Sequence, residues 1–146
     1  MNYKDKIDDH DYLSQEEKWL IGFNINGGSA QPKKTAMKFN VWNRVKFQIA
    51  DNLHKIKHWN IIQGDYHDLE NDESTWFIDP PYQHGGIYYR HNNKYMDYNE
   101  LSEWCKSRNG QIIVCENTKA DWLPFTPLKR MKGSLHTTVE AIWTND

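Results

Sequence analysis

The feature that most limits how this 146-residue chain can fold is a short apolar run that ends in a rigid acidic turn. The run is Trp-Phe-Ile at 76–78, and the turn that follows it is Asp79-Pro80-Pro81-Tyr82. A strand through the run would bring a carboxylate, proline carbonyls and an aromatic ring to its carboxyl end. Open α/β sheets bind ligands at the carboxyl ends of their strands. The sequence therefore predicts a strand over 75–79 and a ligand site directly after it.

The groups of this turn match a planar base that carries an exocyclic amine. The Asp79 carboxylate and the Pro80 carbonyl can accept the two N–H bonds of the amine, Pro81 keeps the turn rigid, and the Tyr82 ring can stack on the base. Accepting both hydrogens moves electron density to the nitrogen, so positioning and electrostatic stabilisation would carry any reaction there. The alternative is a plain turn that ends a strand.

Capping residues and hydrophobic spacing predict three helices. Ser14 with Glu17 three residues later is a capping-box pattern, which predicts a helix over 15–24. Apolar residues at 41, 45, 49, 53 and 56 have helical spacing and predict an amphipathic helix from about residue 40. A third helix is expected between Asp97, as its cap, and Gly110.

The remaining regular elements are expected to be strands of one sheet. They are predicted over 60–64, 111–115, 128–132 and 139–144, with the last two paired as a hairpin around 133–134. Strands and helices that alternate in this way predict an α/β fold. We expect a helical, basic segment with an acidic start over 1–58 and the sheet over 59–146, within one compact domain.

Composition narrows the class of protein. No apolar run approaches the roughly 18 residues that a membrane span needs, and the charged N-terminus lacks the apolar core of a signal peptide. Cys105 and Cys115 form no C-x-x-C pair and are expected to be reduced and buried, as in a cytoplasmic protein. His54 and His58 could share a metal but have no evident third ligand, so no metal site is predicted.

The formal net charge is −2, which is not the overall signature of a nucleic-acid-binding protein. The charge is segregated, however, because the first 17 residues are acidic and the segment 33–57 is basic. Lys33, Lys34 and Lys38 open this basic segment and are candidate contacts to DNA phosphates. A solvated surface explains these lysines equally well.

Four stretches in the same order give the chain a family resemblance. The turn Asp79-Pro80-Pro81-Tyr82 is preceded by Gly64-Asp65-Tyr66 and followed by the apolar runs 111–117 and 140–145. Over about residues 12–146 the chain resembles the phage-encoded, Dam-like class of DNA adenine-N6 methyltransferases. The resemblance implies the C-terminal two-thirds of a Rossmann-like methyltransferase sheet, ending in a β-hairpin.

The resemblance also implies a cofactor, a substrate and further site residues. S-adenosylmethionine would donate the methyl group, and Asp65 and Tyr66 would line the pocket for its adenine ring. The substrate would be an adenine flipped out of DNA. The loop after the turn, with Tyr88, Tyr89 and Arg90, would close over that base. If the chain is phage-encoded, its location would be the cytoplasm of the host cell.

One part of the family pattern is missing from the sequence. Such enzymes begin with a strand and a glycine-rich turn that holds the methionine end of the cofactor, and 26–29 is a poor match because it follows a helical pattern. Three explanations stay open. The chain is a fragment completed by a second chain, it self-associates to complete a site, or it is an inactive relative that binds DNA or a host defence protein.

Overall fold

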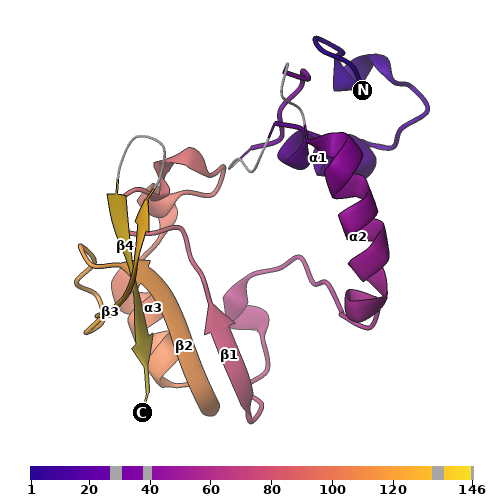
Figure 1. Ribbon diagram of the computed structural model, residues 1–146. Helices are drawn as coiled ribbons and strands as arrows, with labels where there is room; N and C mark the ends of the chain where they lie inside the picture. The colour runs from indigo at the N-terminus through magenta and orange to yellow at the C-terminus, as the bar shows by residue number, and fades with distance from the viewer. Residues whose placement is uncertain (27–30, 38–40, 133–136, 146) are drawn as a thin grey trace. The chain divides into compact units, whose positions relative to one another are not determined.

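The computed structural model describes residues 1–26, 31–37, 41–132 and 137–145. The chain divides into two compact units, Met1–Ile62 (unit 1) and Gln63–Asp146 (unit 2) (Figure 1). Within the described residues, no helix is both long enough and apolar enough to cross a membrane. Each unit has its own cluster of buried side chains.

Unit 1 begins with a capped helix. Helix α1 (Gln15–Asn24) starts where the sequence predicts, because the Ser14 hydroxyl accepts a hydrogen bond from Glu17 N. The Glu17 carboxylate in turn accepts one from Ser14 N at 2.8 Å. The two bonds satisfy backbone donors that the first turn of a helix leaves unpaired. The predicted capping box is therefore confirmed.

The core of unit 1 is small and depends on a close approach to α1. It contains Ile7, Ile21, Ile25 and Ala36, each at most 5% exposed. A Cβ atom on Gly22 would lie 2.6 Å from the Lys33 carbonyl oxygen, so only a glycine lets the segment 31–37 pass this close to α1.

The second helix of unit 1 is amphipathic but buries none of its residues. Helix α2 (Trp42–Ile56) confirms the helix predicted from the spacing of apolar residues. Phe47, Leu53 and Ile56 nevertheless stay 63%, 54% and 42% exposed. The spacing of apolar residues therefore predicted the helix correctly, but it did not show that the apolar side of the helix stays exposed.

Unit 2 is an α/β unit built on a four-stranded mixed sheet with strand order β1-β2-β4-β3 (Figure 1). The predicted α/β class is confirmed. Strand β1 is parallel to β2, and the other two pairs are antiparallel. The predicted final hairpin is present, although its turn at 133–134 lies outside the described residues. The strands are β1 (Ser74–Ile78), β2 (Gly110–Asn117), β3 (Thr126–Lys132) and β4 (Thr137–Thr144).

One helix covers one face of this sheet. Helix α3 (Tyr98–Lys106) starts at the predicted cap, where the Asp97 carboxylate accepts hydrogen bonds from Asn99 N and Glu100 N. Its Leu101 and Cys105 join Ile112 and Val114 of β2 in the buried core. Short 3-10 turns complete the chain: η1 (Ile7–Asp9), η2 (Tyr66–Asp68), η3 (Gly86–Tyr88) and η4 (Asn93–Tyr95).

Both cysteines are free thiols, as the sequence predicts. Cys105 is fully buried and Cys115 is half-buried. Burial raises the pKa of the Cys105 thiol to about 11, which keeps it protonated at neutral pH.

The prediction of a strand over 60–64 is wrong. Those residues form no strand, and Ile61 and Ile62 are 94% and 74% exposed. A strand needs a neighbour to satisfy its backbone groups, and the described part of the chain provides none for this segment. Two adjacent apolar residues are too short a pattern to show whether such a neighbour exists.

The two edges of the sheet differ in their protection. The outer strand β3 contains Pro127, a register shift between Pro127 and Lys129, and the cations Lys129, Arg130 and Lys132. These features discourage a further strand from pairing. The other edge, β1, has none of them, and its Phe77 is 67% exposed. Only the β1 edge is therefore suited to accept another strand.

Candidate functional site

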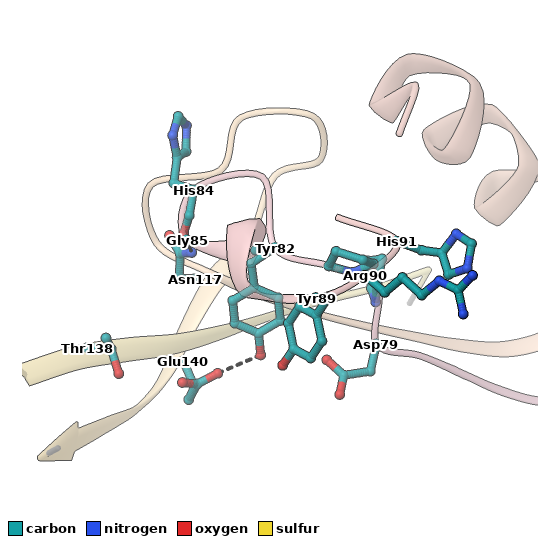
Figure 2. A pocket seen from close by; sticks show the side chains of 13 residues that line it. Asp79, Tyr82, His84, Gly85, Tyr89, Arg90, His91, Asn117, Thr138 and Glu140 are labelled. Carbon is teal, nitrogen blue, oxygen red and sulfur yellow. Dashed lines mark hydrogen bonds between the residues drawn. The ribbon is translucent and has the colours of Figure 1, made fainter. Parts of the chain in front are cut away.

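A cavity of about 690 Å³ lies at the end of the sheet where three strands meet (Figure 2). Asp79 follows β1 directly, Asn117 ends β2, and Glu140 lies in the middle of β4. The parallel strands β1 and β2 have their carboxyl ends together, and the pairing of Asn117 with Glu140 brings β4 to the same place. A cavity of this volume is typical of small-molecule sites. The site predicted after the first strand thus coincides with a real cavity.

The predicted Asp79 and Tyr82 both line this cavity. Figure 2 shows the Asp79 carboxylate turned towards the rings of Tyr82 and Tyr89. Partial burial, followed by the negative charge of Glu140, raises the pKa of Asp79 above its ordinary value. A carboxylate in such surroundings gains from a ligand that donates hydrogen bonds, because the donors replace lost hydration.

Tyr82 is held by a residue that the sequence did not single out. Its hydroxyl donates a 2.7 Å hydrogen bond to Glu140 Oε2, drawn as a dashed line in Figure 2. Burial raises the pKa of Tyr82, and the bond to Glu140 raises it further, so the phenol stays protonated and remains a donor. The turn therefore holds the backbone of Tyr82, and Glu140 of β4 holds its hydroxyl.

Two side chains support the turn, the buried Glu116 and the partly buried Tyr98. The carboxylate of Glu116, which is 0% exposed, accepts hydrogen bonds from Gln83 N and from Asn117 N. Burial raises the pKa of Glu116, although these donors oppose the increase. The Tyr98 hydroxyl donates to the Pro81 carbonyl at 2.5 Å.

The proline carbonyls of the turn have different environments. Burial, with the nearby charge of Glu116, raises the pKa of Tyr98 to about 12, so its hydroxyl remains a donor to Pro81. This bond engages Pro81 and not Pro80. The role of the Pro80 carbonyl as the second acceptor for a ligand amine stays a prediction.

Two side-chain hydrogen bonds hold the start of the loop after the turn, one from strand β2 and one from the 3-10 turn η4. Asn117 Nδ2 donates to the His84 carbonyl at 2.8 Å, and Asn93 Nδ2 donates to the Gln83 carbonyl at 2.8 Å. Gly86 lies tightly against the turn, since a Cβ atom on it would be 2.9 Å from the Pro81 carbonyl carbon. The loop therefore depends on the same turn that carries Asp79 and Tyr82.

The substitution Gly86→Ala is expected to weaken ligand binding in this cavity by at least about tenfold, because the added methyl group has to displace the backbone of Pro81. Gly85→Ala is the matched control. Gly85 has open space around its Cβ position but a φ of 114°, so alanine there costs about 1–3 kcal/mol of strain without touching the turn. Binding titrations and thermal unfolding of both variants test this. Equal binding by the two variants would contradict it.

Two of the three predicted loop residues line the cavity in the structure. Tyr89 and Arg90 do so, together with His91. Figure 2 shows the Arg90 side chain extending away from Tyr82 and Glu140. Arg90 thus brings a positive charge to a cavity that the carboxylates of Asp79 and Glu140 also line. Tyr88 ends the 3-10 turn η3, and its side chain lies outside the described part of the chain.

Asp65 and Tyr66, the residues expected to hold the cofactor, do not line this cavity. The Asp65 carboxylate accepts hydrogen bonds from His67 N at 3.0 Å and pairs with His67 Nδ1 at 2.6 Å. The Tyr66 ring packs edge-on against Trp104, with ring centroids 5.0 Å apart. In this structure both residues stabilise the segment that leads into β1.

His67 joins two carboxylates and should make stability depend on pH. Its Nδ1 contacts Asp65 Oδ1, and its Nε2 contacts Glu100 Oε1 at 3.1 Å. The hydrogen bond to Asp65, and then the charge of Glu100, raise the pKa of His67 above the ordinary value of 6.5. Because the folded-state pKa is the higher one, the stabilisation is fully present below pH 6.5 and is lost as the pH rises through the raised pKa.

We therefore expect the difference in thermal midpoint between the wild-type protein and His67→Gln to shrink as the pH rises from 6 through the raised pKa of His67. His91→Gln, at an exposed histidine of the same unit, should leave the pH dependence in place. Nuclear magnetic resonance titration of the imidazoles gives an independent reading. A His67 midpoint at or below 6.5 would exclude the effect.

The predicted DNA-contacting lysines belong to unit 1. Lys33 and Lys34 are exposed, and Lys34 Nζ lies 3.6 Å from Asp8 Oδ2. This ion pair partly neutralises Lys34, so Lys33 is the stronger candidate for a phosphate contact. Lys38 lies outside the described residues.

Sequence reasoning missed four residues that build the site: Glu116, Asn117, Glu140 and Tyr98. The first two end the second parallel strand, so the rule that placed Asp79 could also have placed them. Glu140 and Tyr98 gave no such signal, because their positions depend on long-range pairing and packing. Comparison of the chain with family models, with curated proteins and with solved structures finds no match.

Proposed function

We propose that the cavity of unit 2 binds a flipped adenine and that the chain is a DNA adenine-N6 methyltransferase-like protein with a partial Rossmann-like sheet. The observation that supports this most strongly is the presence of the Asp79 carboxylate and the Tyr82 ring in one cavity at the carboxyl end of β1. The carboxylate and the Pro80 carbonyl accept the amine hydrogens, and the ring stacks on the base. Arg90, which lines the same cavity, supplies a cation for contact with a phosphate.

The chain's own residues supply positioning and charge for such a reaction. Two acceptors on the amine orient the nitrogen lone pair, and a stacked ring holds the base plane. Flipping a base out of duplex DNA costs a few kcal/mol, and stacking returns roughly 1–3 kcal/mol. The binding of adenine by this cavity is therefore expected to be strongest on single-stranded or mismatched DNA.

The methyl donor would be S-adenosylmethionine, but the residues expected to hold it make other contacts in this structure. The Asp65 carboxylate is engaged by His67, and Tyr66 is packed on Trp104. A second chain or a second copy that pairs with the unprotected edge of β1 would be one way to complete a cofactor site.

The second candidate function is an inactive relative that binds DNA or a host defence protein. The engagement of Asp65 and Tyr66 favours it, since a binding module needs no methyl donor. Calorimetric titration of S-adenosylmethionine into the chain separates the two candidates. Micromolar binding, followed by methyl transfer to DNA, supports the enzyme. Adenine binding with no cofactor binding supports the binding module.

Contact between the basic segment and DNA predicts a salt dependence. If Lys33 contacts a phosphate, the logarithm of affinity falls with the logarithm of salt concentration, and Lys33→Ala reduces the slope by about 1. Lys34→Ala is the matched control and should change the slope less, because Asp8 already pairs with this side chain. Fluorescence anisotropy of a labelled oligonucleotide between 50 and 200 mM salt, about the range where such contacts are lost, measures the slopes. An affinity that does not change with salt concentration would show that these lysines do not contact phosphates.

A further inference from the structure

We infer that Glu140 is a positioning residue of the cavity, which fixes the ring of Tyr82 for stacking on the bound base. This inference rests on the proposed function of the cavity. Glu140 is not part of the Asp79–Tyr82 turn and lies 58 residues beyond Tyr82 in the sequence. Its role comes from one contact, the 2.7 Å hydrogen bond that its Oε2 accepts from the Tyr82 hydroxyl.

The hydrogen bond between Tyr82 and Glu140 links a turn to a rigid strand. Tyr82 belongs to a turn, whereas Glu140 belongs to β4 and is paired with Asn117 of β2 and Lys129 of β3. Glu140 is therefore held by ladders on both sides of its strand. A hydrogen bond from the ring to such a rigid position removes rotation about the side-chain bonds of Tyr82. A ring that is already ordered loses less entropy when it stacks on a base.

The charge of Glu140 strengthens the same arrangement. A hydrogen bond to a charged acceptor contributes more than one between neutral groups. Glu140 is engaged by Tyr82, so Asp79 is the carboxylate that the same cavity offers to a ligand. The Asp79 carboxylate favours an amine and repels a carbonyl oxygen. Adenine, with an amine at C6, should therefore bind in preference to hypoxanthine, which has a carbonyl oxygen there.

A double-mutant cycle tests the inference on the full chain. The probe is a single-stranded oligodeoxythymidylate with one central adenine, and the reference probe has hypoxanthine at that position. Affinities are measured for the wild type, Tyr82→Phe, Glu140→Ala and the double variant. Tyr82→Phe keeps the ring and removes the hydroxyl. Each single variant should bind the adenine probe about tenfold more weakly, and the double variant should bind no more weakly than either.

Two further variants separate positioning from a general loss of structure. Glu140→Gln keeps a hydrogen-bond acceptor and should restore most of the affinity lost in Glu140→Ala. Glu103→Ala, at an exposed glutamate of α3, is the control for removal of a carboxylate. If Glu140→Ala does not fold, the double variant Tyr82→Phe/Glu140→Gln replaces it in the cycle. This double variant should bind the adenine probe no more weakly than Tyr82→Phe alone.

The outcomes distinguish this inference from the proposed function. Additive losses in the double variant would overturn the inference, because Glu140 would then act on the ligand without Tyr82. A wild-type protein that binds adenine and hypoxanthine equally would overturn the proposed function itself. Retained preference for adenine together with additive losses would overturn the positioning role alone.

Discussion

Replacing Asp79 with alanine is expected to weaken binding of the adenine-containing oligonucleotide by about 10- to 150-fold, the equivalent of 1.5–3 kcal/mol for a hydrogen bond to a charged group. The carboxylate lines the cavity and is turned towards the rings of Tyr82 and Tyr89. Asp79→Asn should be nearly as harmful, because its amide can point N–H donors at the ligand amine. Under conditions where the wild type transfers methyl groups, Asp79→Ala should lower the rate by about 10²–10³.

The control for this prediction is Asp72→Asn, an exposed aspartate of the same unit that does not line the cavity. It should bind adenine like the wild type. Circular dichroism and thermal unfolding establish that Asp79→Ala keeps its fold. The charge of Glu140 helps to raise the pKa of Asp79, so the two carboxylates repel each other. Because Asp79→Ala removes this repulsion, the variant should be at least as stable as the wild type. Undiminished adenine binding by folded Asp79→Ala would refute the assigned role.

Gly110→Ala should have the largest effect on stability, a loss of roughly 3–5 kcal/mol in unit 2. Gly110 begins β2 with a φ of 93°, a conformation that alanine adopts only with strain. A Cβ atom there would lie 2.1 Å from the Ser74 carbonyl oxygen and 2.8 Å from Ser74 N. The methyl group therefore collides with backbone at the first register position of the β1–β2 pair, where no side chain can move aside.

Hydrogen exchange suits this test better than global unfolding, because the chain has two units and need not unfold in one step. The amides of Ile112 and Val114 in β2 should lose most of their protection in Gly110→Ala. Gly64→Ala is the matched control, since nothing lies within 4 Å of its Cβ position. Similar protection of β2 in both variants would show that the strands tolerate the methyl group.

Local signals account for what the sequence predicted correctly. The start of α1 follows from Ser14 and Glu17, which are three residues apart and meet within one turn. The end of β1 follows from the prolines after Asp79, and the cap of α3 follows from Asp97. In each case the residues that carry the signal also make the contacts, so no knowledge of the rest of the fold is needed.

The remaining features depend on contacts between distant residues. Glu140 reaches Tyr82 only because β4 pairs antiparallel with β2, and a shift of one residue would turn its side chain to the other face. The error over 60–64 has the same origin, because an apolar pair such as Ile61 and Ile62 cannot show whether a neighbouring strand is present. The expected roles of Asp65 and Tyr66 came from resemblance, and the sequence did not reveal that His67 and Trp104 would engage them.

The support beneath the Asp79–Tyr82 turn has a consequence for how such a protein can diverge. Glu116 is buried and accepts two backbone N–H groups, so its replacement would leave those donors unsatisfied and should be rejected in most lineages. Ile87, Tyr89 and Arg90 are exposed on the loop, and exchanging them sacrifices little buried surface. Substitutions in the loop can therefore change which ligand the cavity prefers, while the turn and its support stay the same.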